Sequence, residues 1–180
     1  IISINEIYTD DWWSFPRRPQ IIHVKWNNYK IIIINNHFKA NDNTTNEDEN
    51  RRKSASEKID QYITENYDDE YVIILGDLND DILDPEDENV FWNFISKSDE
   101  YIFVDMNIAL GNVNNWSFPS WPSHLDHIII SNELFDIYYN SGSKVQTILI
   151  EQLMDNDWNY YNQIISDHRP VGLNLNFNLK

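Results

Sequence analysis

Residues 72–81, VIILGDLNDD, join a run of apolar residues directly to a glycine, several acids and an asparagine. Asp77 and Asn79 are two residues apart, so a strand continuing through Gly76 would project both side chains to the same side. A carboxylate and an amide oxygen together suit a hard cation such as Mg²⁺, with Mn²⁺ or Ca²⁺ as alternatives. An Asp/Asn turn that caps the strand explains the same residues without a metal.

Three further segments place polar residues beside apolar runs. In ISDHRPV, Asp167 could face a metal while the adjacent His168 accepts a proton near neutral pH. In HLDHIIIS, Asp126 could orient a catalytic histidine, and in NNHFKA, His37 ends an apolar run. Each segment also has a structural interpretation: a surface Asp–His pair, a strand-capping aspartate and a histidine satisfied at a sheet edge. The hypothesis of one shared site depends on all four segments meeting.

The elements that would position these residues can be read from periodicity. Residues 20–34 predict a hairpin turning at Asn27-Asn28, whose four consecutive isoleucines indicate a strand covered on both faces. Residues 47–67 predict an amphipathic helix, and a second helix is expected from Pro85, with Asp84 as its N-cap. Further strands are expected at 72–75, 101–106, 126–131, 144–150 and 169–179. This mixture predicts an α/β (α+β) fold of stacked sheets with helices outside.

Composition limits the classes of site and partner. The 180 residues are expected to form a single domain, 1–180, and they contain no cysteine, which excludes disulfides and thiolate metal sites. With 13 basic and 30 acidic residues, the net charge is −17. Such a chain repels polyanions at long range, so any nucleic-acid contact must be local or carried by a metal.

The length of the apolar runs and the start of the chain are the sequence features relevant to membrane insertion and compartment. No apolar run approaches the roughly 20 residues of a membrane-spanning helix. No signal peptide is recognisable, but the chain begins without methionine, so we expect that residues were lost upstream. The compartment is therefore not predicted.

The ordered set NNHFKA, VIILGDLND, HLDHIIIS and ISDHRPV resembles the endonuclease/exonuclease/phosphatase superfamily, the fold of pancreatic deoxyribonuclease. The resemblance covers nearly the whole chain. It implies a four-layered α/β sandwich, with two packed, mainly antiparallel sheets flanked by helices. It also implies divalent-metal-dependent hydrolysis of phosphate esters.

The resemblance implies a role for each matched residue. Asp77 and Asn79 would hold the phosphate and the metal-bound water, and Asp167 would be a further metal ligand. His168 would lie beside the scissile phosphate, oriented by Asp126. His37 would stabilise or protonate the leaving oxygen.

Substrate contacts are expected from two other segments. In SFPRRPQ, Arg17 or Arg18 could bind a phosphate with a bidentate guanidinium, although both could equally be surface charges. Trp116 and Phe118 lie about where the family stacks a ring on substrate, and Trp116 is the candidate contact, but aromatic residues more often belong to a core. The basic cluster of residues 51–53 is either on the substrate side or a solvated face.

The chain also departs from the family pattern. An early asparagine and a Gln-Glu motif, whose glutamate is a principal metal ligand, are not recognisable, and nothing around Glu6 resembles that motif. We therefore expect this chain to be the C-terminal portion of the fold. The first hypothesis is a nuclease acting on DNA or RNA; the alternatives are a phosphatase or phosphodiesterase for small or lipid-headgroup phosphates, and a non-catalytic binding module.

The remaining histidines are expected to lie outside the site. His23 falls inside an alternating strand and His127 on the pleat face opposite Asp126, so both are interpreted as structural. His124 has no predicted role.

Overall fold

The computed structural model describes residues 1–42, 47–140, 142–155 and 157–177. The polar sequence of residues 41–46 also predicts a loop, and residues 43–46 of it lie outside the described residues. The elements are, in chain order, β1 (Ser3–Glu6), β2 (Gln20–Trp26), β3 (Tyr29–His37), α1 (Glu47–Asn66), β4 (Tyr71–Asp77), α2 (Trp92–Ile95), β5 (Tyr101–Phe103), α3 (Met106–Ala109), η1 (Val113–Asn115), β6 (Asp126–Ser131), η2 (Asn132–Leu134), α4 (Phe135–Tyr138), β7 (Lys144–Thr147), η3 (Ile150–Leu153), α5 (Trp158–Ile164) and β8 (Val171–Asn174).

Two sheets organise these elements. The larger sheet has six strands in the order β1-β2-β3-β4-β6-β5, and β7 pairs with β8 in a separate sheet. Strands β3 and β4 are parallel and the other neighbours in the larger sheet are antiparallel. The predicted mixed α/β class is confirmed, but the described residues form one mixed sheet and one two-stranded sheet and do not show four layers.

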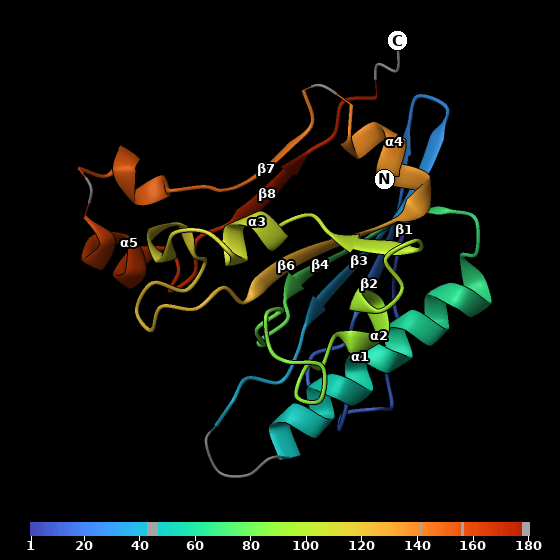
Figure 1. Cartoon of the computed structure of the whole chain (residues 1–180), viewed down its shortest axis with the longest axis horizontal. Helices are drawn as coiled ribbons and strands as arrows, with labels where there is room; N and C mark the ends of the chain where they lie inside the picture. The colour runs from blue at the N-terminus through green and yellow to red at the C-terminus, as the bar shows by residue number, and fades with distance from the viewer. Residues whose placement is uncertain (43–46, 141, 156, 178–180) are drawn as a thin grey trace.

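The isoleucine run of β3 is buried from both sides, as predicted. Ile32 and Ile34 belong to an apolar cluster with Ile59 of α1, whereas Ile31 contacts a second cluster. Because successive side chains of a strand point to opposite faces, the run serves two cores. Figure 1 shows the result, with α1 along one face of the larger sheet and β7 and β8 beyond the other.

Helix α1 matches the predicted helix over residues 47–67 to within one residue. Its first turn contains three acids, which favourably oppose the positive end of the helix dipole. Ala55, Ile59 and Ile63 recur at intervals of four and are buried against the sheet. This helix is therefore held by one apolar stripe.

The helix predicted from Pro85 is wrong over most of its length. Residues 82–91 form turns, and only Trp92–Ile95 is helical. The buried Asn89 side chain donates to the carbonyls of Ile82 and Asp84 and accepts from the amide of Phe91. An asparagine that bonds nearby backbone in this way competes with helical hydrogen bonding.

Several other boundaries differ from the predictions. Strand β5 ends at Phe103, and β7 and β8 are four residues each, shorter than the predicted 144–150 and 169–179. Strand β1 and helix α5 were not predicted. The hairpin and β6 match the predicted segments, with Asn27 at φ 53° in the hairpin turn.

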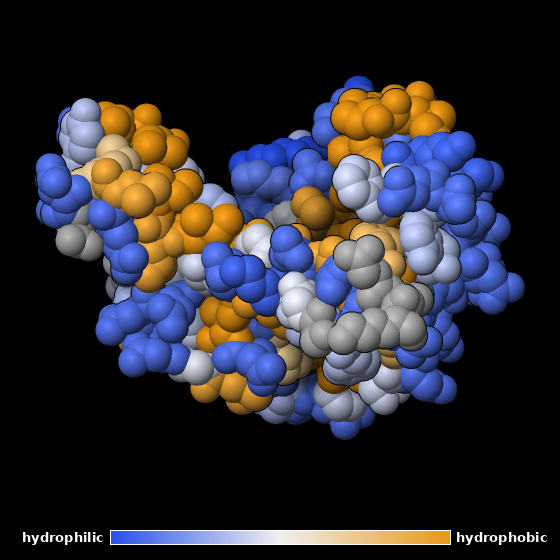
Figure 2. All heavy atoms as spheres, turned by 90° about the horizontal axis from the view of Figure 1, so that it is seen from above, coloured by the Kyte–Doolittle hydropathy of each residue, from blue (hydrophilic) through white to orange (hydrophobic). Residues whose placement is uncertain are grey.

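Apolar side chains are exposed at the end of the molecule formed by η3 and α5. Leu153 is 87% exposed, and Ile164 and Ile165 are each more than half exposed. Figure 2 shows apolar surface on this end, at the left of the view. Among the described residues, no helix has both the length and the apolar character needed to cross a bilayer.

Candidate active site

Three predicted site residues lie in one row across the larger sheet. Asp77 on β4 is paired with His37 on the parallel neighbour β3 and with Asp126 on the antiparallel neighbour β6. His37 Nε2 lies 3.3 Å from Asp77 Oδ2. The register of the three strands therefore brings these residues together, as predicted, because hydrogen-bonded neighbouring strands lie only about 4.8 Å apart.

The glycine before Asp77 allows β3 and β4 to approach at this point. Gly76 has φ +136°, and a Cβ there would lie 1.9 Å from the carbonyl oxygen of Asn36. Three residues after Gly76, Asn79 has φ +56°, a left-handed conformation that asparagine tolerates better than most residues. The side-chain nitrogen of Asn79 donates to the Phe38 carbonyl at 3.2 Å, which leaves its amide oxygen to serve a cation.

His168 completes the row from a distant part of the sequence. Its Nδ1 lies 2.6 Å from Asp126 Oδ2, and its Nε2 lies 3.9 Å from Asp77 Oδ2. The Phe118 ring packs against the imidazole with centroids 4.8 Å apart. The ring is therefore held between a carboxylate and an aromatic face, with one nitrogen directed toward Asp77.

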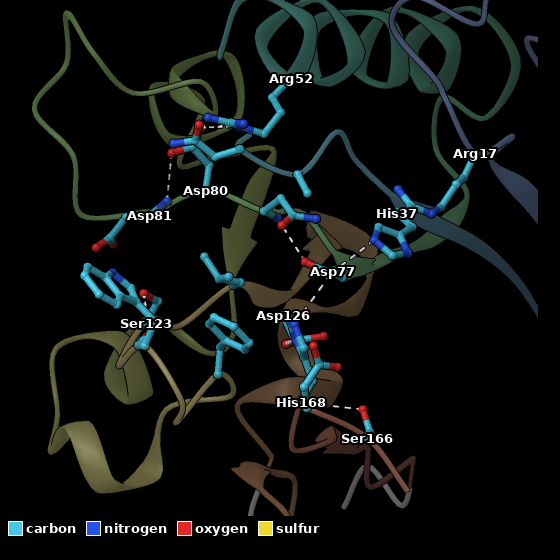
Figure 3. Close-up of a pocket in the computed structure, with 17 residues that line it drawn as sticks. Arg17, His37, Arg52, Asp77, Asp80, Asp81, Ser123, Asp126, Ser166 and His168 are labelled. Atoms are coloured by element: carbon cyan, nitrogen blue, oxygen red, sulfur yellow. Dashed lines mark hydrogen bonds and ion pairs between the residues drawn. The ribbon is translucent and has the colours of Figure 1, made fainter. Parts of the chain in front are cut away.

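These residues line a single pocket of about 940 Å³. Figure 3 shows the side chains of His37, Asp77, Asp126 and His168 gathered on one side of it. The predicted site residues that line the pocket are Arg17, His37, Asp77, Asn79, Asp126, Asp167 and His168. Their roles stay predictions, but seven of the nine residues share one cavity.

Arg18 and Trp116 are the two predicted residues that do not line this pocket. Arg18 forms an ion pair with Glu6 at 3.0 Å. The Trp116 indole donates to the Ile108 carbonyl at 3.1 Å. The aromatic residues that do line the pocket are Phe118 and Trp121. The sequence indicates Phe118 beside Trp116, whereas nothing in the aromatic loop indicates Trp121.

The electrostatics of the pocket favour a cation. Burial and then the neighbouring Asp126 raise the pKa of Asp77 to about 6. Burial lowers the pKa of His37, and the Arg17 guanidinium lowers it further. Burial opposes protonation of His168, but its hydrogen bond to Asp126 and the surrounding carboxylates raise its pKa above the ordinary value.

The donor set fits a divalent metal. One ligand atom from each of Asp77, Asp126 and His168 lies within 4.8 Å of the others. The Asn79 oxygen and the exposed Asp167 carboxylate line the same cavity. A buried carboxylate whose pKa is raised by burial and by a neighbouring carboxylate, as for Asp77, is stabilised by a positive ion, and oxygen-rich sites suit Mg²⁺.

A second group could hold a metal by the same distance criterion. Asp105, His124 and His127 are buried, with ligand atoms within 4.8 Å of one another. However, His124 Nε2 and His127 Nδ1 lie 2.9 and 2.7 Å from Asp105 Oδ2, which are hydrogen-bond distances. The three side chains bond one another as a carboxylate between two imidazoles, in agreement with the structural interpretation of His127, although His124 Nδ1 is buried with no hydrogen-bond partner among the described residues.

Comparisons with known proteins identify the fold. No family model and no curated protein sequence matches the chain. A solved structure of D. rerio TDP2 complexed with single-strand DNA product matches with a TM-score of 0.63 and 16% identity, covering 97% of this chain and 67% of that one. The Bacteroides thetaiotaomicron mannosyl-6-phosphatase Bt3783 matches with a TM-score of 0.57 and 14% identity, covering 98% and 67%.

A third match is more partial. The structure of SmcL gives a TM-score of 0.53 with 18% identity, and covers 73% of this chain and 47% of that one. The chain thus spans about two thirds or less of the length of the structures it resembles. At these identities the likeness establishes fold alone, and that fold is the one shared by the endonuclease/exonuclease/phosphatase superfamily.

Proposed function

We propose that this chain carries the catalytic site of a divalent-metal-dependent phosphoesterase that hydrolyses phosphodiester bonds, with nucleic acid as the first substrate class. The supporting observation is the row of His37, Asp77 and Asp126, completed by His168 at 2.6 Å from Asp126. Structures with this fold include one complexed with a DNA product and one described as a phosphatase. The four-layered sandwich and the single domain expected from the sequence are part of the same proposal.

Asp77, Asn79 and Asp167 are the residues that would hold the cation, with Mg²⁺ as first choice and Mn²⁺ or Ca²⁺ as alternatives. When bound, such an ion neutralises charge that develops on the phosphoryl oxygens. Burial of Asp77, whose side chain is only 17% exposed, keeps its carboxylate in a fixed position. Asn79 supplies a neutral oxygen, which adds a ligand without adding repulsion.

His168 is the proposed general base, and Asp126 orients it. The Nδ1–H of His168 donates to the Asp126 carboxylate, so Nε2 is the atom that accepts the proton of an attacking water. Asp126 is itself fixed, because its backbone amide donates to the Ser117 hydroxyl at 3.1 Å. The imidazolium that forms is stabilised by Asp126 and by the nearby Asp77.

His37 and Arg17 would serve the other side of the phosphate. With a lowered pKa, His37 is neutral near pH 7, and its N–H can stabilise the leaving oxygen by a hydrogen bond. Arg17 is the better of the two predicted arginines for a nonbridging oxygen, because it lines the pocket while Arg18 is paired with Glu6. Trp121 and Phe118 are better placed than Trp116 to contact a substrate base or other flat group.

A second candidate is a phosphatase or phosphodiesterase for a small or lipid-headgroup phosphate. It is favoured by the net charge of −17 and by the five aspartates that line the pocket. Binding of long nucleic acids usually depends on many Lys and Arg contacts, which this chain lacks in number. A non-catalytic binding module is the third candidate, and it would have no need of the His168–Asp126 pair.

The proposal is tested by measuring hydrolysis with Mg²⁺, with Ca²⁺ and with EDTA. The substrates are plasmid and single-stranded DNA, RNA, sphingomyelin and inositol phosphates. Metal-dependent cleavage of DNA or RNA supports the nuclease, and cleavage of only the small or lipid substrates supports the second candidate. Failure to hydrolyse any of them, by a chain shown by circular dichroism to be folded, would favour the binding module.

A further inference from the structure

The residue that follows Asn79 is held from two sides by the rest of the protein. The Asp80 carboxylate accepts from Arg52 Nε at 2.7 Å, and Arg52 also donates to the Lys39 carbonyl at 3.1 Å. The Asp80 backbone carbonyl lies 3.0 Å from His127 Nε2. Arg52 of helix α1 and His127 of strand β6 thus both bond Asp80, in the loop that carries Asn79. Figure 3 shows the Arg52 contact.

Both contacts are buried and directional. Arg52 is 5% exposed and His127 is 1% exposed. A guanidinium bound to a carboxylate in such surroundings holds a fixed geometry, which a surface pair does not.

The ring of His127 must donate from both nitrogens. Nδ1 faces the Asp105 carboxylate and Nε2 faces the Asp80 carbonyl, and neither of these oxygens can donate. The ring lies edge-on to Phe91 and Phe103, at centroid distances of 5.8 and 5.9 Å, so it has little freedom to turn. The His127 ring is therefore a rigid link between the buried Asp105 carboxylate and the backbone of the loop at Asp80.

The loop needs such support because its backbone is unusual. Asn79 lies in the left-handed region, and its amide donates to Asp77 Oδ1 at 3.2 Å. If the Asp80 backbone shifted, the Asn79 side chain and the Asp77 carboxylate would move relative to each other. Groups that orient metal ligands commonly change metal affinity 10–100-fold when they are removed.

We propose that Arg52 and His127 are positioning residues that clamp Asp80 and thereby hold Asp77 and Asn79 in the arrangement that binds a divalent cation. The cation site is part of the proposed function, but binding can be measured without catalysis. The alternative is that both side chains only stabilise the fold. The two possibilities differ in which variants lose metal affinity.

Two substitutions of His127 separate the two contacts. The side-chain nitrogen of asparagine occupies about the place of Nδ1, so His127→Asn keeps the bond to Asp105 and loses the bond to Asp80. Glutamine reaches about as far as Nε2, so His127→Gln keeps the Asp80 bond and leaves Asp105 bonded only by His124 and the Ile128 backbone amide. We expect His127→Gln to be the less stable variant and His127→Asn to be the one with weaker metal binding.

The measurement is titration of the metal-free chain with Mn²⁺ by calorimetry in 0.15 M KCl, with Asp77→Asn as the background for nonspecific binding. We expect the dissociation constant for Mn²⁺ to rise about tenfold in His127→Asn and about threefold or less in His127→Gln. Melting temperatures should fall in the opposite order. If Mn²⁺ affinity follows the melting temperature, or changes in neither variant, the clamp is overturned.

A second pair of variants decides the question if the His127 variants do not fold. Arg51 precedes Arg52 on α1 but bonds the Trp13 carbonyl at 2.6 Å, away from the pocket. Arg52→Met should weaken Mn²⁺ binding about tenfold and Arg51→Met should leave it within twofold; equal effects would overturn the clamp. If the wild-type chain binds Mn²⁺ but hydrolyses no phosphate ester, the proposed function is wrong. The role of Arg52 and His127 in metal binding is then still decided by the affinities of these variants.

Discussion

The protein contains two clusters of aspartate and histidine that use the same groups in opposite proportions. In the pocket, Asp77 and Asp126 share the imidazole of His168. In the core, one carboxylate, Asp105, lies between His124 and His127. The pocket cluster is partly exposed, whereas the core cluster is at most 2% exposed.

Stoichiometry and burial explain why only one of the clusters is a candidate for chemistry. In the pocket, His168 is the imidazole whose pKa is raised, since burial lowers the pKa of the nearby His37; two carboxylates beside one such imidazole leave excess negative charge, and burial together with Asp126 raises the pKa of Asp77 to about 6. One carboxylate with two imidazoles is the reverse case, and the hydrogen bonds and positive charge from both histidines lower the pKa of Asp105 although burial opposes this. A cation and a substrate would stabilise the first cluster, whereas in the second cluster both imidazoles already bond the carboxylate.

The largest expected effect is the loss of activity on removal of the pocket imidazole. We expect His168→Ala to lower kcat by about 10²–10⁴-fold, the usual contribution of a general base. The melting temperature should change little, because the side chain is 20% exposed and lies at the pocket wall. His23→Ala, which removes a histidine bonded to Ser3 and Tyr67, is the matched control and should retain activity.

Removal of the core carboxylate should act on stability instead. Asp105→Asn leaves His127 without its counter-ion, so we expect the free energy of unfolding to fall by about 3–5 kcal/mol. Urea denaturation measures this loss. An effect as small as that of a surface substitution would show that the core cluster is not an ion pair.

The pH dependence of the same variant sharpens the contrast. Asp105 contributes stability that is present above its ordinary pKa of 3.8 and is lost as pH falls through its lowered folded-state pKa. His127 contributes stability that is complete below its ordinary pKa of 6.5 and is lost as pH rises through its raised folded-state pKa. The difference between wild type and Asp105→Asn should therefore be largest between about pH 4 and 6.5.

In the pocket, removing a carboxylate should raise the free energy of unfolding, whereas removing Asp105 from the core lowers it. The folded-state pKa of Asp77 is raised, so ionisation of Asp77 destabilises the metal-free protein; this cost is absent below 3.8, grows as pH rises and is complete above about 6. We expect Asp77→Asn in EDTA to raise the free energy of unfolding by about 1–3 kcal/mol at pH 7.5. The gain should vanish near pH 3.5, and a gain independent of pH would contradict the assignment.

The smallest effect concerns the rim of the pocket. Trp121 is 77% exposed and lines the cavity, so Trp121→Ala should raise KM for a substrate with stacking bases roughly fivefold, or about 1 kcal/mol. Trp116→Ala should leave KM unchanged, because that indole bonds the Ile108 carbonyl instead. Steady-state kinetics on single-stranded DNA compares the two, and the reverse order would restore the prediction for Trp116.

The sequence by itself determined the central strands of the larger sheet and the candidate residues at their ends. Alternation and the isoleucine run predicted the hairpin, spacing of four predicted α1, and the Gly-Asp-x-Asn segment predicted a polar strand exit. These signals are local, since they depend on neighbours within a few residues. For the same reason they failed at residues 85–91, where the buried Asn89 side chain replaces helical hydrogen bonds.

Only the tertiary structure decided which of these groups meet. The register of β3, β4 and β6 places His37, Asp77 and Asp126 in one row, and the chain returns after more than 40 residues to bring His168 against Asp126. It also buries His127 with Asp105 and leaves its neighbour Asp126 in the pocket. Adjacent residues of a strand face opposite sides of the sheet, so their chemistry depends on what each side packs against, and that is set by contacts between distant segments.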